Sequence, residues 1–126
     1  MTKPAPLLDT NIIIDVLNGN KLARDYLKSL PVLKVSSISV FEVVAGCTGE
    51  RQKQLPIARE IFEVCEVIEL SQLAAEHAAI EFTKSPQKNK ILDLLIAGTA
   101  ATNELEVATR NPKDFKSVKA FEPYNL

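Results

Sequence analysis

The stretch that decides the fold is Pro6-Leu7-Leu8-Asp9-Thr10-Asn11-Ile12-Ile13-Ile14-Asp15-Val16-Leu17, in which two apolar runs flank three polar residues. The first run predicts a short buried strand over residues 6–8, and the second predicts a helix through residues 12–17. The pair Asn18-Gly19 is typical of a helix end. A strand that leads at once into a helix is the repeating unit of an α/β fold, so the rest of the chain is expected to alternate in the same way.

Capping residues and prolines mark further helices and strands along the chain. A helix over residues 21–30 is ended by Pro31, and a strand follows over residues 32–35. Ser39 is the predicted N-cap of the next helix, which runs to about Gly46, and Glu42 completes a capping-box pattern three residues later. Further helices are expected through residues 57–62, from Ser71 to the residue before Pro86, and over 91–102, with strands over 64–70, 106–109 and 118–121. The sequence therefore predicts an α/β domain with a mostly parallel central sheet of about five strands flanked by helices.

Length, charge and cysteine usage narrow the class of protein. The 126 residues have the length of one domain, which is expected to span residues 1–126. A formal net charge of -1 means that a nucleic-acid partner has to be held by local basic patches. Cys47 and Cys65 have no CxxC spacing, and His77 is the only histidine, so zinc is set aside. No apolar run approaches the roughly 20 residues that span a bilayer. The chain also begins without a signal-peptide pattern, so the protein is expected in the cytoplasm.

Polar residues stand beside the predicted strands at points that share one edge of the sheet. In a parallel α/β sheet, ligands bind outside the carboxyl ends of the strands. Asp9 ends the first predicted strand, and Glu42 lies in the first turn of the helix that leaves the second. Asp93 begins the helix that feeds the fourth strand, and Asn111 and Asp114 follow that strand. Carboxylates at close range cannot all stay ionised without a cation between them, so the sequence predicts a metal site at this edge.

Four motifs occur in order over the whole length of the chain: Leu8-Asp9-Thr10-Asn11, the segment from Ser39 to Gly46, Asp93-Leu94-Leu95-Ile96-Ala97-Gly98-Thr99-Ala100 and Thr109-Arg110-Asn111-Pro112-Lys113-Asp114-Phe115. With these motifs the chain resembles the PIN-domain family, and most closely its single-domain toxin nucleases of the VapC type. The resemblance implies a PIN-like fold and a Mg²⁺- or Mn²⁺-dependent endoribonuclease that hydrolyses RNA phosphodiester bonds. It also implies an antitoxin protein as a partner and a homodimer.

Three acids match the acidic positions that the family shares, namely Asp9, Glu42 and Asp93. The fourth position matches either Asn111, where PIN domains place an acid, or Asp114, where toxin-like members with an asparagine keep one. Magnesium takes a few carboxylate ligands and lowers the pKa of water that can then attack a phosphodiester. Asp9 and Asp93 are therefore expected to be direct metal ligands. Glu42 or Asp114 is expected to orient the attacking water or to hold a second ion.

Other polar residues of the motifs are expected to serve the substrate or to support the carboxylates. Thr10 and Asn11 are placed to hydrogen-bond the substrate or a carboxylate. Arg110 is the cation closest in sequence to the predicted edge, where phosphodiester attack needs charge neutralised on the phosphate. Lysines also flank the predicted site in sequence, at positions 84, 88, 90, 113, 116 and 119. They form either a solvated face or a guide for a polyanion, and both interpretations stay open.

Two other classes of function compete with the ribonuclease. The first is a non-catalytic PIN-like module that binds RNA or protein, which Asn111 favours because it is a weaker metal ligand than aspartate. The second is an aspartyl-phosphate receiver or a phosphatase, both of which carry an acid after the first strand. Such a phosphatase needs a second aspartate two residues later, where this chain has Asn11. The second class is therefore disfavoured.

Overall fold

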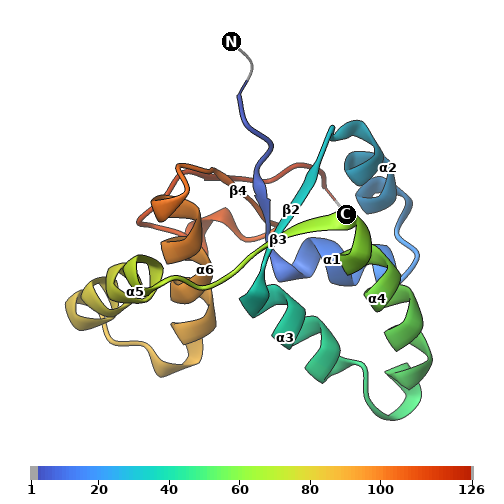
Figure 1. Ribbon diagram of the computed structural model, residues 1–126, viewed down its shortest axis with the longest axis horizontal. Helices are drawn as coiled ribbons and strands as arrows, with labels where there is room; N and C mark the ends of the chain where they lie inside the picture. Colours follow the sequence, from blue (N-terminus) through green and yellow to red (C-terminus); the bar gives the residue numbers. More distant parts are fainter. Residues whose placement is uncertain (1–2, 126) are drawn as a thin grey trace.

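The computed structural model describes residues 3–125 and contains one parallel sheet between two groups of helices (Figure 1). The strands are β1 (Leu7–Leu8), β2 (Leu33–Ser36), β3 (Cys65–Ile68), β4 (Val107–Ala108) and β5 (Ala120–Phe121). Their spatial order is β3-β2-β1-β4-β5, and every neighbouring pair is parallel. This confirms the predicted α/β class, with a sheet that is wholly parallel among the described residues.

Six α-helices surround the sheet within residues 3–125, and their bounds follow the predicted pattern closely. They are α1 (Thr10–Leu17), α2 (Lys21–Ser29), α3 (Ser37–Gly46), α4 (Leu55–Val64), α5 (Gln72–Lys84) and α6 (Ile91–Thr102). Short 3-10 turns are η1 (Gly49–Gln54), η2 (Lys88–Lys90) and η3 (Pro112–Asp114). None of the helices within residues 3–125 has the length and hydropathy needed to cross a bilayer.

The central strand β1 separates two apolar cores. Leu7 and Leu8 are both fully buried and point to opposite faces of the sheet, because side chains alternate along a strand. Leu8 packs with residues of the α1 to α4 side, including Ile12 and Val43, whereas Leu7 packs with the α6 side, including Ile96. Figure 1 shows the same division, with α5 and α6 on one side of the strands and α1 to α4 on the other. The residue after β1 therefore emerges at the middle of the carboxyl edge.

The N-cap of α3 differs from the prediction. Ser36, not Ser39, caps the helix. Its backbone is extended, at φ -87° and ψ 155°, and its Oγ accepts from the backbone N of Ser39 at 3.2 Å. The last residue of β2 reaches the cap position first, so Ser39 already lies in the first turn. Glu42 is consequently in the second turn and is not the capping partner. Its carboxylate is free to contact another element.

Helices α5 and α6 approach each other closely at one glycine. A Cβ placed on Gly98 lies 2.3 Å from the backbone O of Ala74 and 3.1 Å from its carbonyl carbon. Ala74 is fully buried in the first turn of α5, so the obstacle is helix backbone and cannot rotate away. Gly98 therefore sets the separation of the two helices, a role that the sequence analysis did not assign.

Candidate functional site

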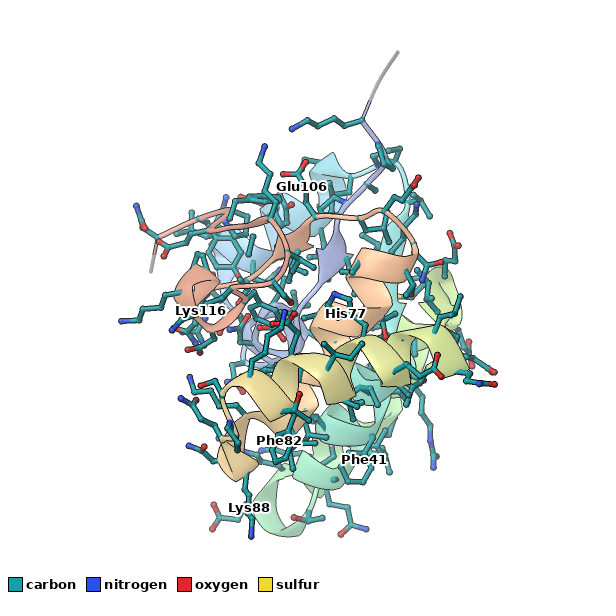
Figure 2. All side chains as sticks on the ribbon, turned by 90° about the vertical axis from the view of Figure 1, so that its left-hand side faces the viewer. Phe41, His77, Phe82, Lys88, Glu106 and Lys116 are labelled. Carbon is teal, nitrogen blue, oxygen red and sulfur yellow. The ribbon has the colours of Figure 1, made fainter. Side chains whose placement is uncertain are left out.

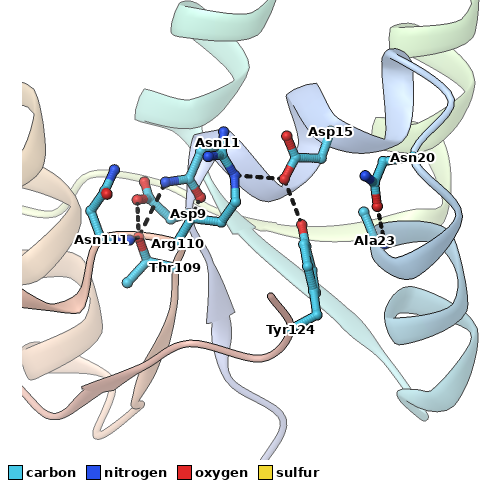
Figure 3. A network of polar contacts seen from close by, with 9 residues as sticks. All are labelled: Asp9, Asn11, Asp15, Asn20, Ala23, Thr109, Arg110, Asn111 and Tyr124. Carbon is cyan, nitrogen blue, oxygen red and sulfur yellow. Dashed lines mark hydrogen bonds and ion pairs between the residues drawn. The ribbon is translucent and has the colours of Figure 1, made fainter. Parts of the chain in front are cut away.

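Asp9 stands at the carboxyl end of β1 and is held by two hydrogen bonds, of which Figure 3 shows the one with Thr109. It is the N-cap of α1, where its Oδ1 accepts from the backbone N of Thr10 at 2.7 Å. Its Oδ2 accepts from the Thr109 hydroxyl, also at 2.7 Å. Burial raises the pKa of Asp9 to about 6 against these two hydrogen bonds, and the charges of Asp93 and Glu42 add to the rise. Asp9 is therefore a buried acid whose ionised form a nearby cation would favour.

Thr109 is a site residue to which the sequence analysis gave no role. Besides donating to Asp9, its hydroxyl oxygen accepts from Asn11 Nδ2 at 3.3 Å and from the backbone N of Asn111 at 3.0 Å. Asn11 in turn accepts from the backbone N of Arg110 at 3.3 Å. Asn11 thus reaches a carboxylate only through Thr109. The available signal in the sequence was a threonine directly after the apolar run of β4, and the structure shows that this threonine is fully buried.

Thr10 connects α1 to the second acid. Its hydroxyl donates to Glu42 Oε1 at 2.6 Å, and it lies 2.9 Å from the hydroxyl oxygen of Ser39. Thr10 and Ser39 are both buried, whereas Glu42 is half-buried. Thr10 therefore fixes the direction of the Glu42 side chain, in agreement with its expected contact to a carboxylate.

Asp93 and Asp114 lie at the same edge of the sheet. Together with Asp9 and Glu42 they form what we call the acidic edge. Asp93 lies in the first turn of α6, as predicted, and is half-buried. Burial raises the pKa of Asp93, the charges of Asp114 and Glu42 raise it further, and Lys90 opposes them. Asp114, at the end of η3, pairs with Lys90 at 2.5 Å. The fold therefore brings the predicted acids close enough for their charges to act on one another.

Arg110 lies against a different acid from those expected. Its Nε is 2.6 Å from Asp15 Oδ2, and the Tyr124 hydroxyl donates to the same oxygen at 2.8 Å. Figure 3 shows this group beside α1, on the far side of Asn11 from Asp9. Asp15 is buried and needs these partners, so it engages the arginine. The role of Arg110 toward a substrate phosphate stays a prediction, since the structure pairs its guanidinium with Asp15. The cation paired with Asp114 is Lys90.

The two candidates for the fourth position lie in different surroundings. The Asn111 residue is exposed, and its backbone N is tied to Thr109. Asp114 is half-buried, and its charge is the largest electrostatic contribution that raises the pKa of Asp93. Of the two, Asp114 is therefore the residue that is coupled to the other acids.

The acidic edge offers the ligand atoms that a hard divalent cation prefers, although its acids do not form a compact metal-binding group. Within residues 3–125, no three His, Cys, Asp or Glu side chains form a ready-made metal-binding group. The acids offer only carboxylate oxygens, which Mg²⁺ and Mn²⁺ prefer over softer ligands. Burial and like charges raise the pKa of Asp9 and of Asp93. A bound cation would offset both effects, because it stabilises the ionised carboxylates. The residues present fit such an ion.

The raised pKa of Asp9 predicts how stability depends on pH. Its value of about 6 exceeds the ordinary 3.8, so the folded protein binds this proton more tightly than the unfolded chain. The stabilisation is present below pH 3.8 and is lost as the pH rises through 6. We expect Asp9→Asn to remove this pH dependence. We expect Thr109→Val to strengthen it, because valine lacks the hydroxyl that donates to the ionised carboxylate. Urea unfolding in EDTA from pH 4 to 7.5 measures the effect, and parallel curves for wild type and Asp9→Asn would contradict it.

These features define an α/β protein with a buried, mutually coupled acidic site at the carboxyl edge of a parallel sheet. The family model for the PIN domain matches residues 7–120, and the chain belongs to this family. It is 27% identical over 120 residues to Ribonuclease VapC10 of Mycobacterium tuberculosis, covering 93% of this chain and 90% of that protein.

Solved structures of similar chains agree with the assignment. A chain in a toxin-antitoxin complex from Klebsiella pneumoniae is 31% identical with a TM-score of 0.82, over 97% of this chain and all (100%) of that one. A chain of FitAcB from Neisseria gonorrhoeae is 27% identical with a TM-score of 0.79, over the same shares of 97% and 100%. The described fold is therefore that of the PIN domain.

Proposed function

We propose that this chain is a single PIN domain that acts as a metal-dependent endoribonuclease, the toxin of a toxin-antitoxin pair. The observation that carries the proposal is the electrostatic coupling of Asp9, Glu42 and Asp93 at the carboxyl edge of the sheet. The similarity to Ribonuclease VapC10 supports RNA as the substrate class. The free thiols of Cys47 and Cys65 suit a reducing compartment, and we keep the cytoplasm as the expected location.

The acids take different parts in the proposed reaction. Asp9 and Asp93 would hold Mg²⁺ or Mn²⁺, and such an ion would supply positive charge at the phosphate and lower the pKa of the attacking water. Thr109 keeps Asp9 in place through its 2.7 Å hydrogen bond. Thr10 holds one oxygen of Glu42, so that the other is left to orient the water or a second ion. These positioning contacts use neutral hydroxyls and leave the negative charge of the site intact.

We assign the fourth acidic position to Asp114 and not to Asn111. The charge of Asp114 raises the pKa of Asp93, and Lys90 Nζ lies 2.5 Å from Asp114 Oδ1. Lys90 is in turn the cation near the attacked phosphate, in the place that the sequence analysis gave to Arg110. Asp114 thus has a cationic partner within the site.

An antitoxin is the proposed partner, because similar chains were solved as toxin-antitoxin complexes. An inhibitor that presents an arginine to Asp9, Glu42 and Asp93 neutralises these carboxylates in place of the cation, and it does so with two parallel hydrogen bonds. Apolar surface for a protein partner is present on α3 and α5, where Phe41 is 62% and Leu73 67% exposed. Figure 2 labels Phe41 on this side of the molecule. The homodimer stays a prediction.

An assay on the purified protein tests the proposal. We expect cleavage of a mixed RNA pool with Mg²⁺ or Mn²⁺, loss of cleavage in EDTA, and recovery when the metal is restored in excess. Adding the protein encoded beside the chain should inhibit cleavage, and raised metal should weaken that inhibition because both compete for the same carboxylates. A folded protein that binds RNA but cleaves none under any of these conditions would instead favour the non-catalytic module.

A further inference from the structure

A cavity of about 460 Å³ lies beside the acidic edge. Its wall is built by the end of α5, the turn η2, α6 and the segment after η3, and it includes Gln87, Lys90, Leu94, Lys113, Asp114 and Lys116. Two of these residues, Lys90 and Asp114, are the ion pair of the acidic edge. Leu94 directly follows Asp93 in α6, so the cavity adjoins Asp93 and shares Asp114 with the acidic edge.

The cavity carries surplus positive charge. Its acids are already paired, Glu81 with Lys84 at 3.2 Å and Asp114 with Lys90 at 2.5 Å. Lys113 and Lys116 are exposed and form no ion pair with any residue in the range 3–125. Figure 2 shows Lys116 on the C-terminal segment, near the end of α5 that carries Phe82. Two unpaired lysines at the wall of a cavity favour an anionic ligand.

The rest of the wall suits more than a small inorganic anion. Leu94 and Ala97 give the cavity an apolar floor, and Gln87 adds an amide that can both donate and accept. A volume of about 460 Å³ lies in the range of sites for small organic ligands. The apolar residues can pack against a flat ring, and the lysines can bind a phosphate. A nucleotide combines these two groups. A base inside a double helix is paired and stacked and cannot enter such a hollow.

We propose that this cavity is a subsite for one unpaired RNA nucleotide next to the scissile phosphate, with Lys113 and Lys116 on the flanking phosphates and Leu94 under the base. The proposal rests on the proposed ribonuclease activity and adds to it the strand state of the substrate and the path of the chain. The nucleotide in the cavity would hold the adjoining phosphodiester at the carboxylates, because Lys90 and Asp114 belong to both places.

Binding of a fluorescent single-stranded RNA oligomer in EDTA, across a salt series, tests the subsite. The double variant Lys113→Gln/Lys116→Gln should weaken binding by about 10-fold and make the slope of log affinity against log salt shallower by about 1.4, because each lost phosphate contact removes about 0.7. The control Lys28→Gln/Lys53→Gln removes the same charge from exposed lysines of α2 and η1 and should match wild type. Duplex RNA of the same sequence should bind more weakly than the single strand.

Cleavage in Mg²⁺ separates the subsite from the activity on which it rests. The lysine double variant should raise KM by about 10-fold and keep kcat within about twofold of wild type, because the carboxylates are untouched. Equal losses in both double variants, or equal affinity for duplex and single strand, would overturn the subsite while wild-type cleavage stands. If the wild-type protein cleaved no RNA, the proposed ribonuclease activity would be wrong. The proposal that the nucleotide lies beside a scissile bond would then be wrong as well.

Discussion

Replacing Asp93 with asparagine should lower the kcat for RNA cleavage by at least ~10³-fold, which corresponds to about 4 kcal/mol of transition-state stabilisation. Asparagine keeps the size of the side chain but removes the charge that holds the cation. The fold should survive, because Asp93 is half-buried and its pKa is raised by burial and by Asp114 and Glu42. Without metal, the free energy of unfolding should therefore be unchanged or higher, since the variant relieves this repulsion.

Two measurements make that result decisive. Turnover is measured in Mg²⁺ with wild type and with Asp25→Asn, which removes an exposed carboxylate of α2 and should leave the rate unchanged. Unfolding in urea and EDTA reports whether Asp93→Asn is folded. Normal turnover by a pure, folded Asp93→Asn variant would exclude Asp93 from the proposed site.

Gly98→Ala should be the most damaging small change to the fold. The new methyl group would lie 2.3 Å from the backbone O of Ala74, so α5 and α6 must move apart. Such overpacking against backbone costs about 2–3 kcal/mol in the free energy of unfolding after the helix-propensity gain of up to about 1 kcal/mol. We expect Tm to fall by roughly 5–10 °C. Thermal unfolding followed by circular dichroism measures this.

The matched control for that change is Gly46→Ala. Gly46 is likewise a helical glycine, the last residue of α3, but a Cβ there meets nothing within 4 Å. This substitution should leave Tm unchanged or raise it slightly, because alanine restricts the unfolded chain. If Gly98→Ala were as harmless as Gly46→Ala, the close approach of α5 and α6 would not constrain the fold.

Much of the fold was predictable because its signals are local. The helix over 91–102 was predicted with the bounds of α6, since an apolar run there follows a polar loop. The N-cap of α3 was misplaced because Ser36 and Ser39 both carry a capping hydroxyl. Only the end of β2 decides between them, and strand ends are set by pairing with other strands.

The meeting of the predicted acids at one edge of the sheet was predictable for a different reason. Parallel strands end at one edge, so acids that follow them meet there whatever their separation in sequence. The side-chain contacts around those acids could not be predicted. Asp15 contacts both Arg110 and Tyr124, which lie far from it in sequence, and no motif predicts that the Thr109 hydroxyl donates to Asp9. Side-chain pairing of this kind depends on rotamers and burial, which a sequence pattern does not contain.

The hydrogen bond between Thr109 and Asp9 also has a consequence for the chain while it is being made. Its two residues are 100 positions apart, and β1 gains its β4 neighbour only when residues 107–108 exist. At about 5–20 residues per second, a ribosome needs roughly 5–20 s to travel that distance. Through most of its own translation, the proposed nuclease therefore has no assembled site with which to attack the messenger and ribosome that are producing it.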